Sequence, residues 1–332
     1  MKKSDINIAV LLGGASPERA VSKQSGKAMF EAIRNLGYNV KVIDPAYGLE
    51  QPEKTEDYFS DCDCSVIYND NYIKTINSKL FDDIDLAVIA LHGKWGEDGT
   101  IQSLLELRGI KYTGSTVLGS ALSMDKVRSK IMFSHFNVTT PKWIEVTRET
   151  NTEKINKMIN EKFGYPCIIK PNDQGSTIGL TKCKSEKELE QAVLESSQFS
   201  KRVLIEEFIP GREVAVGIIN NTLLPVLEII PKHELYDYEC KYTDGMTDYI
   251  VPADISKLLE DELKKQTKIA FDSLGCKDYG RVDFRIDKNN IPFCLEVNTL
   301  PGMTSHSLVP KMAKAMGIEF EELIDMIINS AL

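Results

Sequence analysis

The chain has 332 residues, of which 42% are hydrophobic and 27% are charged, so a disordered chain is excluded and more than one core can be buried. We expect two or three globular units. The net charge of −9 argues against nucleic acid or an anionic membrane as the main partner, so any phosphate site must be a local cluster of cations.

The sequence shows no sign of a membrane span or a secretion signal. No apolar run approaches the ~18 residues of a spanning helix, and the start MKKSDINIAVLLGG lacks a cleavage site. Seven cysteines without a CxxC pair indicate a reducing compartment, and we interpret all seven as packing or surface residues; the CDC at 62–64 lacks a second ligand pair for zinc. We therefore expect a cytoplasmic protein that does not bind a membrane.

The N-terminal part alternates between strand and helix patterns. Residues 6–12, 20–38 and 39–44 form one βαβ unit, and 85–110 add another strand and helix. The carboxyl ends of parallel strands meet at one edge, which is where Glu18 and His92 fall. The first turn reads GGxSxE rather than GxGxxG, so a dinucleotide site is not favoured. Taken alone, His92 is better explained as a hydrogen-bonded residue at a strand end.

A second unit begins after residue 124, where the helix of SALSMDKVRSK leads to the strand YPCIIKP. In IIKPNDQGSTIGLTKC, Lys170 ends a strand and is followed by a loop with Gly175 and Gly179 and then by a second strand. Glycines let backbone amides approach a phosphate closely, so the pattern predicts a β-hairpin lid over an anion. It is not a Walker loop, because the lysine precedes the glycines. An ordinary glycine-containing hairpin explains the same pattern.

Two acids interrupt the apolar run over residues 202–219. Glu206 follows three apolar residues, and Glu213 follows a Pro-Gly turn. Carboxylates beside an apolar hinge suit the amino group of adenine and the hydroxyls of ribose. A solvated edge strand explains them equally well.

A hairpin is predicted over residues 279–298, with its turn at Asn289 and Asn290, which tolerate left-handed backbone conformations. Residue numbers at facing positions then sum to 579. Asp283 therefore lies opposite Glu296, on the same face as the pair below them, because side chains alternate along a strand.

That pair is Arg281 and Asn298, so one face of the hairpin carries two carboxylates, an amide and a guanidinium. Carboxylates about 5 Å apart repel one another unless a cation lies between them. Carboxylate and amide oxygens favour Mg²⁺ or Mn²⁺, shared with phosphate oxygens, over zinc. A salt-bridge network of Arg281 without a metal is the alternative.

Seven stretches in the same order carry a resemblance to the D-alanine–D-alanine ligase family of the ATP-grasp superfamily, over essentially the whole chain: LLGGASPERAVSKQSG, ALHGKWGEDGT, YTGSTVLGSALSMDKVRSK, IIKPNDQGSTIG, YDYECKY, GRVDF and LEVNTLPGMTSHSLVP. The resemblance implies an α/β fold with a parallel-sheet (pre-ATP-grasp) domain over residues 1–124. A central ATP-grasp subdomain with the glycine-rich lid is implied over 125–211, and a C-terminal subdomain with the metal, oxyanion and second substrate sites over 212–332. A homodimer is also implied.

The reaction implied by the resemblance belongs to the synthesis of peptidoglycan precursors. The γ-phosphate of ATP is transferred to the carboxylate of one D-alanine, and the amine of a second D-alanine attacks the acyl phosphate. The residues that match the family's ATP contacts are Lys126, Lys170, Gly175, Ser176, Glu206, Glu207, Ile209, Glu213 and Lys241, and those that match the ligands of two Mg²⁺ (or Mn²⁺) ions are Asp283, Glu296 and Asn298.

The remaining matches concern the amino acids. Arg281 and the backbone N–H of Gly302 resemble the oxyanion site, while Ser307 and the Leu308 amide lie at a predicted helix N-terminus suited to a carboxylate. Glu18 and His92 match contacts to the first D-alanine. Glu18, Ser176 and Tyr242 resemble a hydrogen-bonded trio that joins the N-terminal domain, the lid and a closing loop.

Three places depart from the family pattern: Lys94-Trp95, Ala20 and Asp173-Gln174. They leave open a D-alanine–D-serine ligase, a D-alanine–D-lactate ligase or a paralogue of a specialised pathway. Tyr242, which ester-forming members commonly replace, favours the dipeptide. In a different class, a catalytically silent nucleotide-binding regulator would have the same fold, but every phosphate, metal and oxyanion position holds a competent residue. We interpret His306 as a turn or cap residue.

Overall fold

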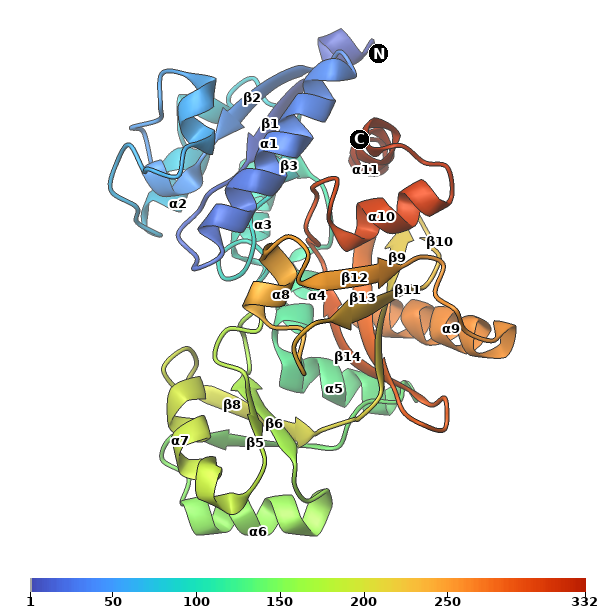
Figure 1. Cartoon of the computed structure of the whole chain (residues 1–332). Coiled ribbons are helices and arrows are strands. Elements are labelled where there is room, and N and C mark those ends of the chain that lie inside the picture. Colours follow the sequence, from blue (N-terminus) through green and yellow to red (C-terminus); the bar gives the residue numbers. More distant parts are fainter. Residues whose placement is uncertain (1) are drawn as a thin grey trace.

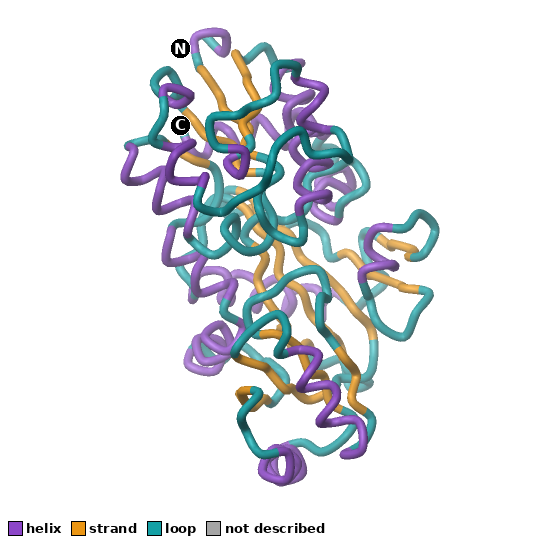
Figure 2. Tube along the Cα trace, turned by 90° about the vertical axis from the view of Figure 1, so that its left-hand side faces the viewer, coloured by secondary structure: helices purple, strands orange, loops and turns teal. Residues whose placement is uncertain are grey.

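The computed structural model describes residues 2–332, arranged as three sheets that succeed one another along the molecule (Figures 1 and 2). Within this range no helix combines the length and the apolar character that a membrane crossing needs. Short 3₁₀ turns cover η1 Lys3–Asp5, η2 Pro45–Tyr47, η3 Thr55–Phe59 and η4 Lys79–Phe81.

The first sheet is parallel, as the βαβ pattern predicts, with strand order β2-β1-β3-β4. Its strands are β1 Asn7–Leu11, β2 Asn39–Ile43, β3 Leu86–Ile89 and β4 Lys111–Tyr112, and its helices are α1 Arg19–Asn35, α2 Asn71–Ile76, α3 Thr100–Arg108 and α4 Val117–Met124. β1 and β3 are wholly apolar where they cross the core, which is typical of strands covered on both faces.

The turn after β1 brings Glu18 to the carboxyl edge of this sheet. Gly13 has φ +77°, and a Cβ atom there would lie 2.1 Å from the Asp44 carboxylate. Gly14 donates its N–H to the same carboxylate over 3.0 Å. Only a chain without side chains at these two positions can turn so tightly, and α1 then starts directly after Glu18.

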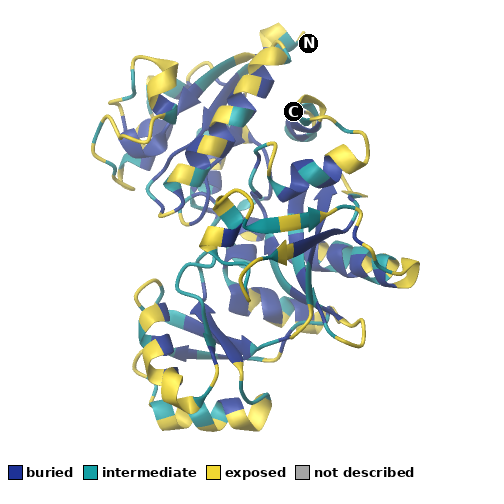
Figure 3. Cartoon of the chain, in the orientation of Figure 1, coloured by how far each residue is buried: buried dark blue, intermediate teal, exposed yellow. Residues whose placement is uncertain are grey.

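The second sheet is antiparallel, in the order β5-β8-β6-β7. Its elements are β5 Trp143–Thr147, α6 Thr152–Lys162, β6 Cys167–Pro171, β7 Thr181–Cys183, α7 Glu186–Ser196 and β8 Arg202–Glu207. β6 and β7 form the predicted lid hairpin. The helices α6 and α7 cover one face, with buried residues turned to the sheet and exposed ones outward (Figure 3).

The third sheet has the order β12-β11-β9-β13-β14, with β10 beside β9. Its strands are β9 Arg212–Ile219, β10 Thr222–Leu223, β11 Leu227–Pro231, β12 Thr247–Ile250, β13 Tyr279–Ile286 and β14 Pro292–Asn298, and the helices near it are α5 Lys126–His135, α8 Tyr238–Tyr242, α9 Lys257–Ser273, α10 Leu308–Ala315 and α11 Phe320–Ala331. Residues 236–248, which begin with the stretch YDYECKY and were predicted as a closing loop, are called the closing segment below; they contain a short helix, α8, and the start of an edge strand, β12.

The hydrophobic clusters do not follow the chain in simple order. The largest cluster joins the first sheet to α10 and α11, and α11 packs beside α1 (Figure 1). A second cluster lies between the third sheet, α9 and Phe133 of α5. The third is confined to residues 144–205 of the central sheet and its helices. The C-terminal helices α10 and α11 therefore pack in the same core as the first sheet, while the central sheet has a core of its own.

Candidate active site

A cavity of about 590 Å³ lies between the edge of the first sheet, α8 and the start of α10. A smaller cavity of about 120 Å³ lies between the central and third sheets. The cavities adjoin, because both are lined by Gly175, Ser176, Tyr236, Lys241, Arg281 and Glu296. A chemical group can therefore pass from a molecule in one cavity to a molecule in the other.

The β13–β14 hairpin places Arg281 and Glu296 among the residues that line both cavities, which we call the shared wall, and Asp283 beside them in the smaller cavity. The structure pairs Asp283 with Glu296 and Arg281 with Asn298, as the sequence predicts. Beyond them the register shifts, and Phe284 pairs with Cys294. The turn is therefore centred on Asn289 rather than between the two asparagines. Of the two, Asn290 alone has a positive φ.

The shift leaves Leu295 as a bulge, and this bulge determines which way Glu296 faces. Cys294 is fully buried, and in a regular strand the residue two positions later would face the same buried side. The extra residue reverses the alternation, so that Leu295 and Glu296 both line the smaller cavity. An acid in an apolar strand is thereby kept out of the core.

Each hairpin carboxylate is balanced by a cation. Arg281 binds Asp283 through two bonds of 2.6 and 2.8 Å, and the Asn298 amide donates to Asp283 over 2.9 Å. Lys126 lies 3.2 Å from Glu296. Burial opposes ionisation of Glu296, but the lysines around it outweigh burial and lower its pKa to about 2. Glu296 is thus a charged group, and each of the two acids has a cation beside it.

This donor set fits magnesium. Two carboxylates and an amide lie at facing and adjacent positions on one side of the hairpin, and all can offer hard oxygen ligands. Asp283 and Glu296 have cationic partners in the chain, which shows that the place demands positive charge. The salt-bridge network considered from sequence is present, and it uses the same oxygens that a metal would need.

The smaller cavity collects lysines at the base of the lid hairpin. Lys170 lies 2.5 Å and Lys130 2.8 Å from the two oxygens of Glu206, all three being buried. Burial opposes the charge of Glu206, but the two lysines outweigh it and lower the pKa of the acid. Glu206 thus holds Lys170 at the cavity wall. Lys130 was missed from sequence, although its regular spacing from Lys126 on the same helix could have indicated it.

The side of the smaller cavity away from the hairpin carboxylates is formed by the chain between β8 and β9. Glu207, Phe208 and Ile209 line it, and Glu213 lies at the start of β9. Arg285 donates to Glu213 over 3.0 Å. The predicted contacts Glu207, Ile209 and Glu213 therefore line one side of the smaller cavity. The apolar residues between these two carboxylates in the chain include Phe208 and Ile209.

A chain of hydrogen bonds connects three separate parts of the molecule. Ser176 of the lid donates to Glu18 of the first domain, and its hydroxyl lies 2.8 Å from the Tyr242 hydroxyl of α8. Thr177 also donates to the Tyr236 carbonyl over 3.0 Å. The structure thus brings the predicted trio together, and the lid and α8 meet above the shared wall.

Glu18 has one carboxylate oxygen directed into a confined space. Among residues 2–332, no hydrogen-bond partner is found for its buried Oε2. A Cβ atom on Gly93 would lie 2.3 Å from this oxygen, and one on Gly175 would lie 2.9 Å away. Burial raises the pKa of Glu18, while Ser176 and Lys241 oppose the increase. The oxygen can accept a bond from a cationic group of a ligand.

Glu97 is a site residue that was not identified from sequence, although it lies within one of the seven matching stretches. It lines the larger cavity with Glu18 and accepts the Gly93 N–H over 2.7 Å. Burial and the charge of Glu18 raise the pKa of Glu97 to about 8. The signal in the sequence was an acid within a glycine-containing turn after His92, where loops of the sheet edge converge.

His92 is buried beside these acids and also lines the larger cavity. Its Nε2 lies 2.9 Å from the Ser25 hydroxyl, which accepts the Met303 N–H over 3.3 Å. Burial lowers the pKa of His92 to about 4, so the ring is neutral. The strand-end histidine expected from sequence is hydrogen-bonded and also faces the cavity.

The opposite wall of the larger cavity is the start of α10. Ser307 is the N-cap residue, as predicted, and its hydroxyl accepts the Thr304 N–H over 3.1 Å. Gly302 and Leu308 also line the cavity here. His306 is exposed at the rim, and Lys311 donates to its carbonyl over 2.6 Å. Backbone donors at a helix start favour a carboxylate.

Lys241 is one of the residues that line both cavities. Burial lowers its pKa, although Glu296 and other acids nearby oppose the decrease. Its ammonium lies 5.2 Å from the centre of the Tyr236 ring.

Two of the unusual positions lie away from the larger cavity. Trp95 has φ +72° and packs against the large core cluster, and Ala20 is exposed on α1. The residues that line the cavity include neither. Asp173 and Gln174 stand at the start of the lid, where the Gln174 carbonyl accepts a bond of 2.8 Å from Lys126. Trp95 and Ala20 therefore do not shape the walls of the larger cavity.

Comparisons with known proteins agree over the whole chain. A family model described as D-ala D-ala ligase N-terminus matches residues 7–115, and one described as D-ala D-ala ligase C-terminus matches residues 132–329. The D-alanine–D-alanine ligase of Haemophilus influenzae (strain PittEE) is 41% identical over 323 residues, which cover 97% of this chain and 100% of that protein.

Solved structures are similar over nearly the same extent. A D-alanine–D-alanine ligase from Bacillus anthracis, complexed with ATP, has 34% identity and a TM-score of 0.77, covering 98% of this chain and 96% of that one. The VanG D-Ala:D-Ser ligase from Enterococcus faecalis has 30% identity and a TM-score of 0.81, covering 98% and 99%.

Proposed function

The chain belongs to the D-alanine–D-alanine ligase family, and on this premise we propose that its two adjoining cavities join two molecules of D-alanine at the expense of ATP. The observation that carries the proposal is the shared wall, where Lys241, Arg281 and Glu296 face both cavities. The product, D-alanyl-D-alanine, is a building block of peptidoglycan. Residues 1–124, 125–211 and 212–332 are proposed as the three structural parts that form the site.

ATP occupies the smaller cavity. The base lies against the segment of Glu207 and Ile209, and the ribose lies near Glu213. Lys126 and Lys170 meet the phosphates at the base of the lid, Gly175 and Ser176 cover them, and Lys241 closes over the terminal phosphate at the shared wall. These positions bring a phosphoryl group to the larger cavity without displacing the base.

Two Mg²⁺ ions are proposed beside the phosphates. Asp283, Glu296 and Asn298 would hold them, with Arg281 and Lys126 released from the carboxylates. The ions would offset the negative charge of the β- and γ-phosphates during transfer.

The first D-alanine enters the larger cavity with its ammonium facing Glu18 and its carboxylate toward the shared wall. There the carboxylate oxygen attacks the γ-phosphorus and ADP leaves, giving an acyl phosphate. Glu18, Ser176 and Tyr242 keep the lid and α8 in place over this product. Water is thereby kept from an anhydride that it would otherwise hydrolyse.

The second D-alanine binds with its carboxylate at Ser307 and the Leu308 amide. Its neutral amine attacks the acyl carbon, and the charge that develops on the acyl oxygen is met by Arg281 and the Gly302 N–H. Collapse of this intermediate releases phosphate and forms the peptide bond, while the amine gives up a proton. His92 stays neutral beside the place of the first D-alanine. Its hydrogen bond with Ser25 holds this part of the cavity wall in position.

The proposal is tested by incubating the protein with ATP, Mg²⁺ and D-alanine. We expect phosphate release that depends on D-alanine, together with D-alanyl-D-alanine detected by mass spectrometry. ATP hydrolysis that is indifferent to D-alanine, or nucleotide binding without turnover, would instead support the silent regulator.

A competition assay addresses the second substrate, because the similar VanG structure is a D-Ala:D-Ser ligase. With equal D-alanine, D-serine and D-lactate near neutral pH, we expect D-alanyl-D-alanine as the main product. Tyr242→Phe removes the hydroxyl bonded to Ser176 and should shift the product ratio toward the ester. A dominant D-serine dipeptide or ester from the unaltered protein would overturn the assignment.

We also propose a homodimer formed through the first domain. Leu49, Val66, Tyr68 and Ile73 are large hydrophobic residues that are more than half exposed, and they fall in one stretch of this domain. A contiguous group of exposed apolar residues marks an association surface, and we propose that these four residues form one. Light scattering of the intact protein and of Val66→Glu tests this; a monomeric intact protein would exclude it.

A further inference from the structure

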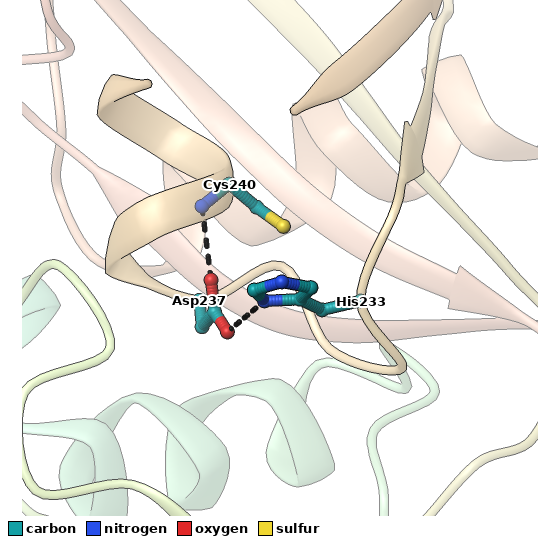
Figure 4. Close-up of side chains that lie close together, drawn as sticks. All are labelled: His233, Asp237 and Cys240. Atoms are coloured by element: carbon teal, nitrogen blue, oxygen red, sulfur yellow. Dashed lines mark hydrogen bonds and ion pairs between the residues drawn. The ribbon is translucent and has the colours of Figure 1, made fainter. Parts of the chain in front are cut away.

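A cluster of three metal-binding side chain types lies on the segment between β11 and β12, apart from the hairpin carboxylates. His233 comes shortly after β11, Asp237 is the N-cap residue of α8, and Cys240 lies within α8. One ligand atom from each lies within 4.8 Å of the other two. Figure 4 shows Asp237 bonded to the Cys240 N–H on one side and to His233 on the other.

Asp237 organises the cluster. One carboxylate oxygen accepts the Cys240 N–H over 2.9 Å, and the other lies 2.7 Å from His233 Nδ1. The first bond starts α8 and so fixes the direction of the Cys240 side chain; the second holds the imidazole against the helix start. The three groups are thus brought together by the local fold.

The chemistry of the cluster differs from that of the hairpin. Imidazole, thiolate and carboxylate together favour Zn²⁺, whereas the oxygen ligands of the hairpin favour Mg²⁺. Ligand atoms about 2.0–2.3 Å from a tetrahedral zinc lie roughly 3.5 Å from one another, so small side-chain rotations suffice to close the cluster. His233 is exposed, which gives the ion access and leaves a fourth position for water.

We propose that His233, Asp237 and Cys240 form a binding site for Zn²⁺ or a similar soft divalent cation, which fixes the closing segment. The site is distinct from the magnesium ligands of the proposed reaction. A bound ion would connect His233 and Asp237, which precede α8, to Cys240 within that helix.

The consequence for activity comes from the position of α8. Lys241 and Tyr242 directly follow Cys240, and the Cys240 carbonyl accepts a bond of 2.6 Å from Thr247 of β12. A metal ion that binds the cluster therefore rigidifies the element that must move when substrates enter and products leave. Bound zinc should slow turnover by slowing this movement.

Binding is measured first with Co²⁺ in place of zinc, in the absence of nucleotide. Intact protein should show a thiolate-to-cobalt charge-transfer absorption that saturates at one ion per chain and that added Zn²⁺ removes. Cys240→Ala should lose the absorption, and His233→Ala should weaken binding. The matched control replaces both exposed cysteines, Cys62→Ala and Cys64→Ala, and should keep the absorption.

Loss of the absorption in the control with its retention in Cys240→Ala would place the ion at the exposed cysteines and overturn the proposal. Absence of any thiolate band at stoichiometric cobalt would overturn it as well. His233 lies on the surface, so His233→Ala is expected to fold, and its circular dichroism checks this.

The coupling to the closing segment is tested with saturating Mg²⁺ and ATP. Zinc should lower the turnover of intact protein several-fold and protect residues 232–247 from proteolysis, and both effects should be lost in His233→Ala. Equal inhibition of intact protein and His233→Ala would mean that zinc acts at the magnesium ligands instead. The cobalt measurement needs no activity, so failure of the ligase proposal and failure of the zinc site are distinguishable.

Discussion

At the scale of single residues, Asp283 and Glu296 face each other across β13 and β14 with a cation on each. Replacing either with alanine should leave the fold intact, because one strand position loses a charge at the edge of a cavity. The loss of even an indirect metal contact commonly costs about 10–100-fold, so turnover should fall by at least about 100-fold. Steady-state kinetics at ordinary Mg²⁺ and circular dichroism measure the two expectations.

Asp272→Ala is the matched control, because Asp272 is an exposed carboxylate of α9 that pairs with Lys268. Surface pairs of this kind contribute little, so its kinetics should be unchanged. Near-normal turnover in Asp283→Ala or Glu296→Ala would remove these residues from the metal site.

Glu97 should make the stability of the protein depend on pH. Burial and Glu18 raise its pKa from 4.5 to about 8, so in that range the folded state holds a proton that the unfolded state releases. Stability should therefore fall as pH rises from about 5 to about 8, with a slope of at most about 1.4 kcal/mol per pH unit from one proton. Urea unfolding across this range should show a smaller slope for Glu97→Gln. Exposed Glu190→Gln is the control, and a slope reduced equally in both variants would contradict the assignment.

The sequence identified a residue where its type and its place agreed. Asp283 and Glu296 were predicted as facing acids because period-two alternation in a hairpin is regular enough to count. Lys130 and Glu97 were missed because the role of each depends on a charged partner distant in the chain. Lys130 pairs with Glu206, and the charge of Glu18 acts on Glu97. The local signals, a regular lysine spacing and an acid in a glycine-containing turn, do not reveal these partners, because the partnerships depend on the packing of sheets.

At the scale of elements, the lid over residues 173–179 and the closing segment over residues 236–248 should become protected when substrates bind. They meet through Ser176 and Tyr242, and Tyr242 is exposed in this structure. Limited proteolysis should cut these segments more slowly with ATP and a phosphinate analogue of the acyl intermediate. A cleavage pattern that is the same with and without these ligands would argue against closure.

The elements themselves were predictable where hydrophobic periodicity was long. The βαβ units and the lid hairpin match the predicted ranges closely. The short helix α8 and the edge strand β12 were predicted as loop, because five and four residues are too few for a periodic signal. Their structure depends on the Asp237 cap and on pairing with β11.

At the scale of the whole molecule, the separate core of the central sheet should make that part unfold independently. Ile159→Ala removes a fully buried side chain from this core and should cost about 2–5 kcal/mol. Hydrogen exchange should then increase in β5 to β8 and not in the first sheet. The matched variant is Ile327→Ala, in the cluster that joins α11 to the first sheet. It should increase exchange in both α11 and the first sheet. A uniform increase for Ile159→Ala would show a single cooperative unit.

The general architecture was accessible from sequence. Alternating strands and helices predict the parallel sheet of the first domain, and the two predicted hairpins are found within the antiparallel sheets of the other two parts. The packing between distant segments was not accessible. Nothing in the local patterns indicates that α11 would return to α1, or that Tyr38 would donate to Asp325 over 2.8 Å. Such contacts depend on the shape of the completed sheets.

The bulge at Leu295 has a consequence for how this protein can evolve. Because one additional residue sets the direction of Glu296, the proposed magnesium site should tolerate changes of residue type along β14 better than changes of chain length. A single deletion between Pro292 and Leu295 would turn the acid toward the core while leaving every proposed ligand encoded. Insertions and deletions accepted during divergence should therefore fall in the turn over residues 287–291, or occur in compensating pairs on both sides of the bulge.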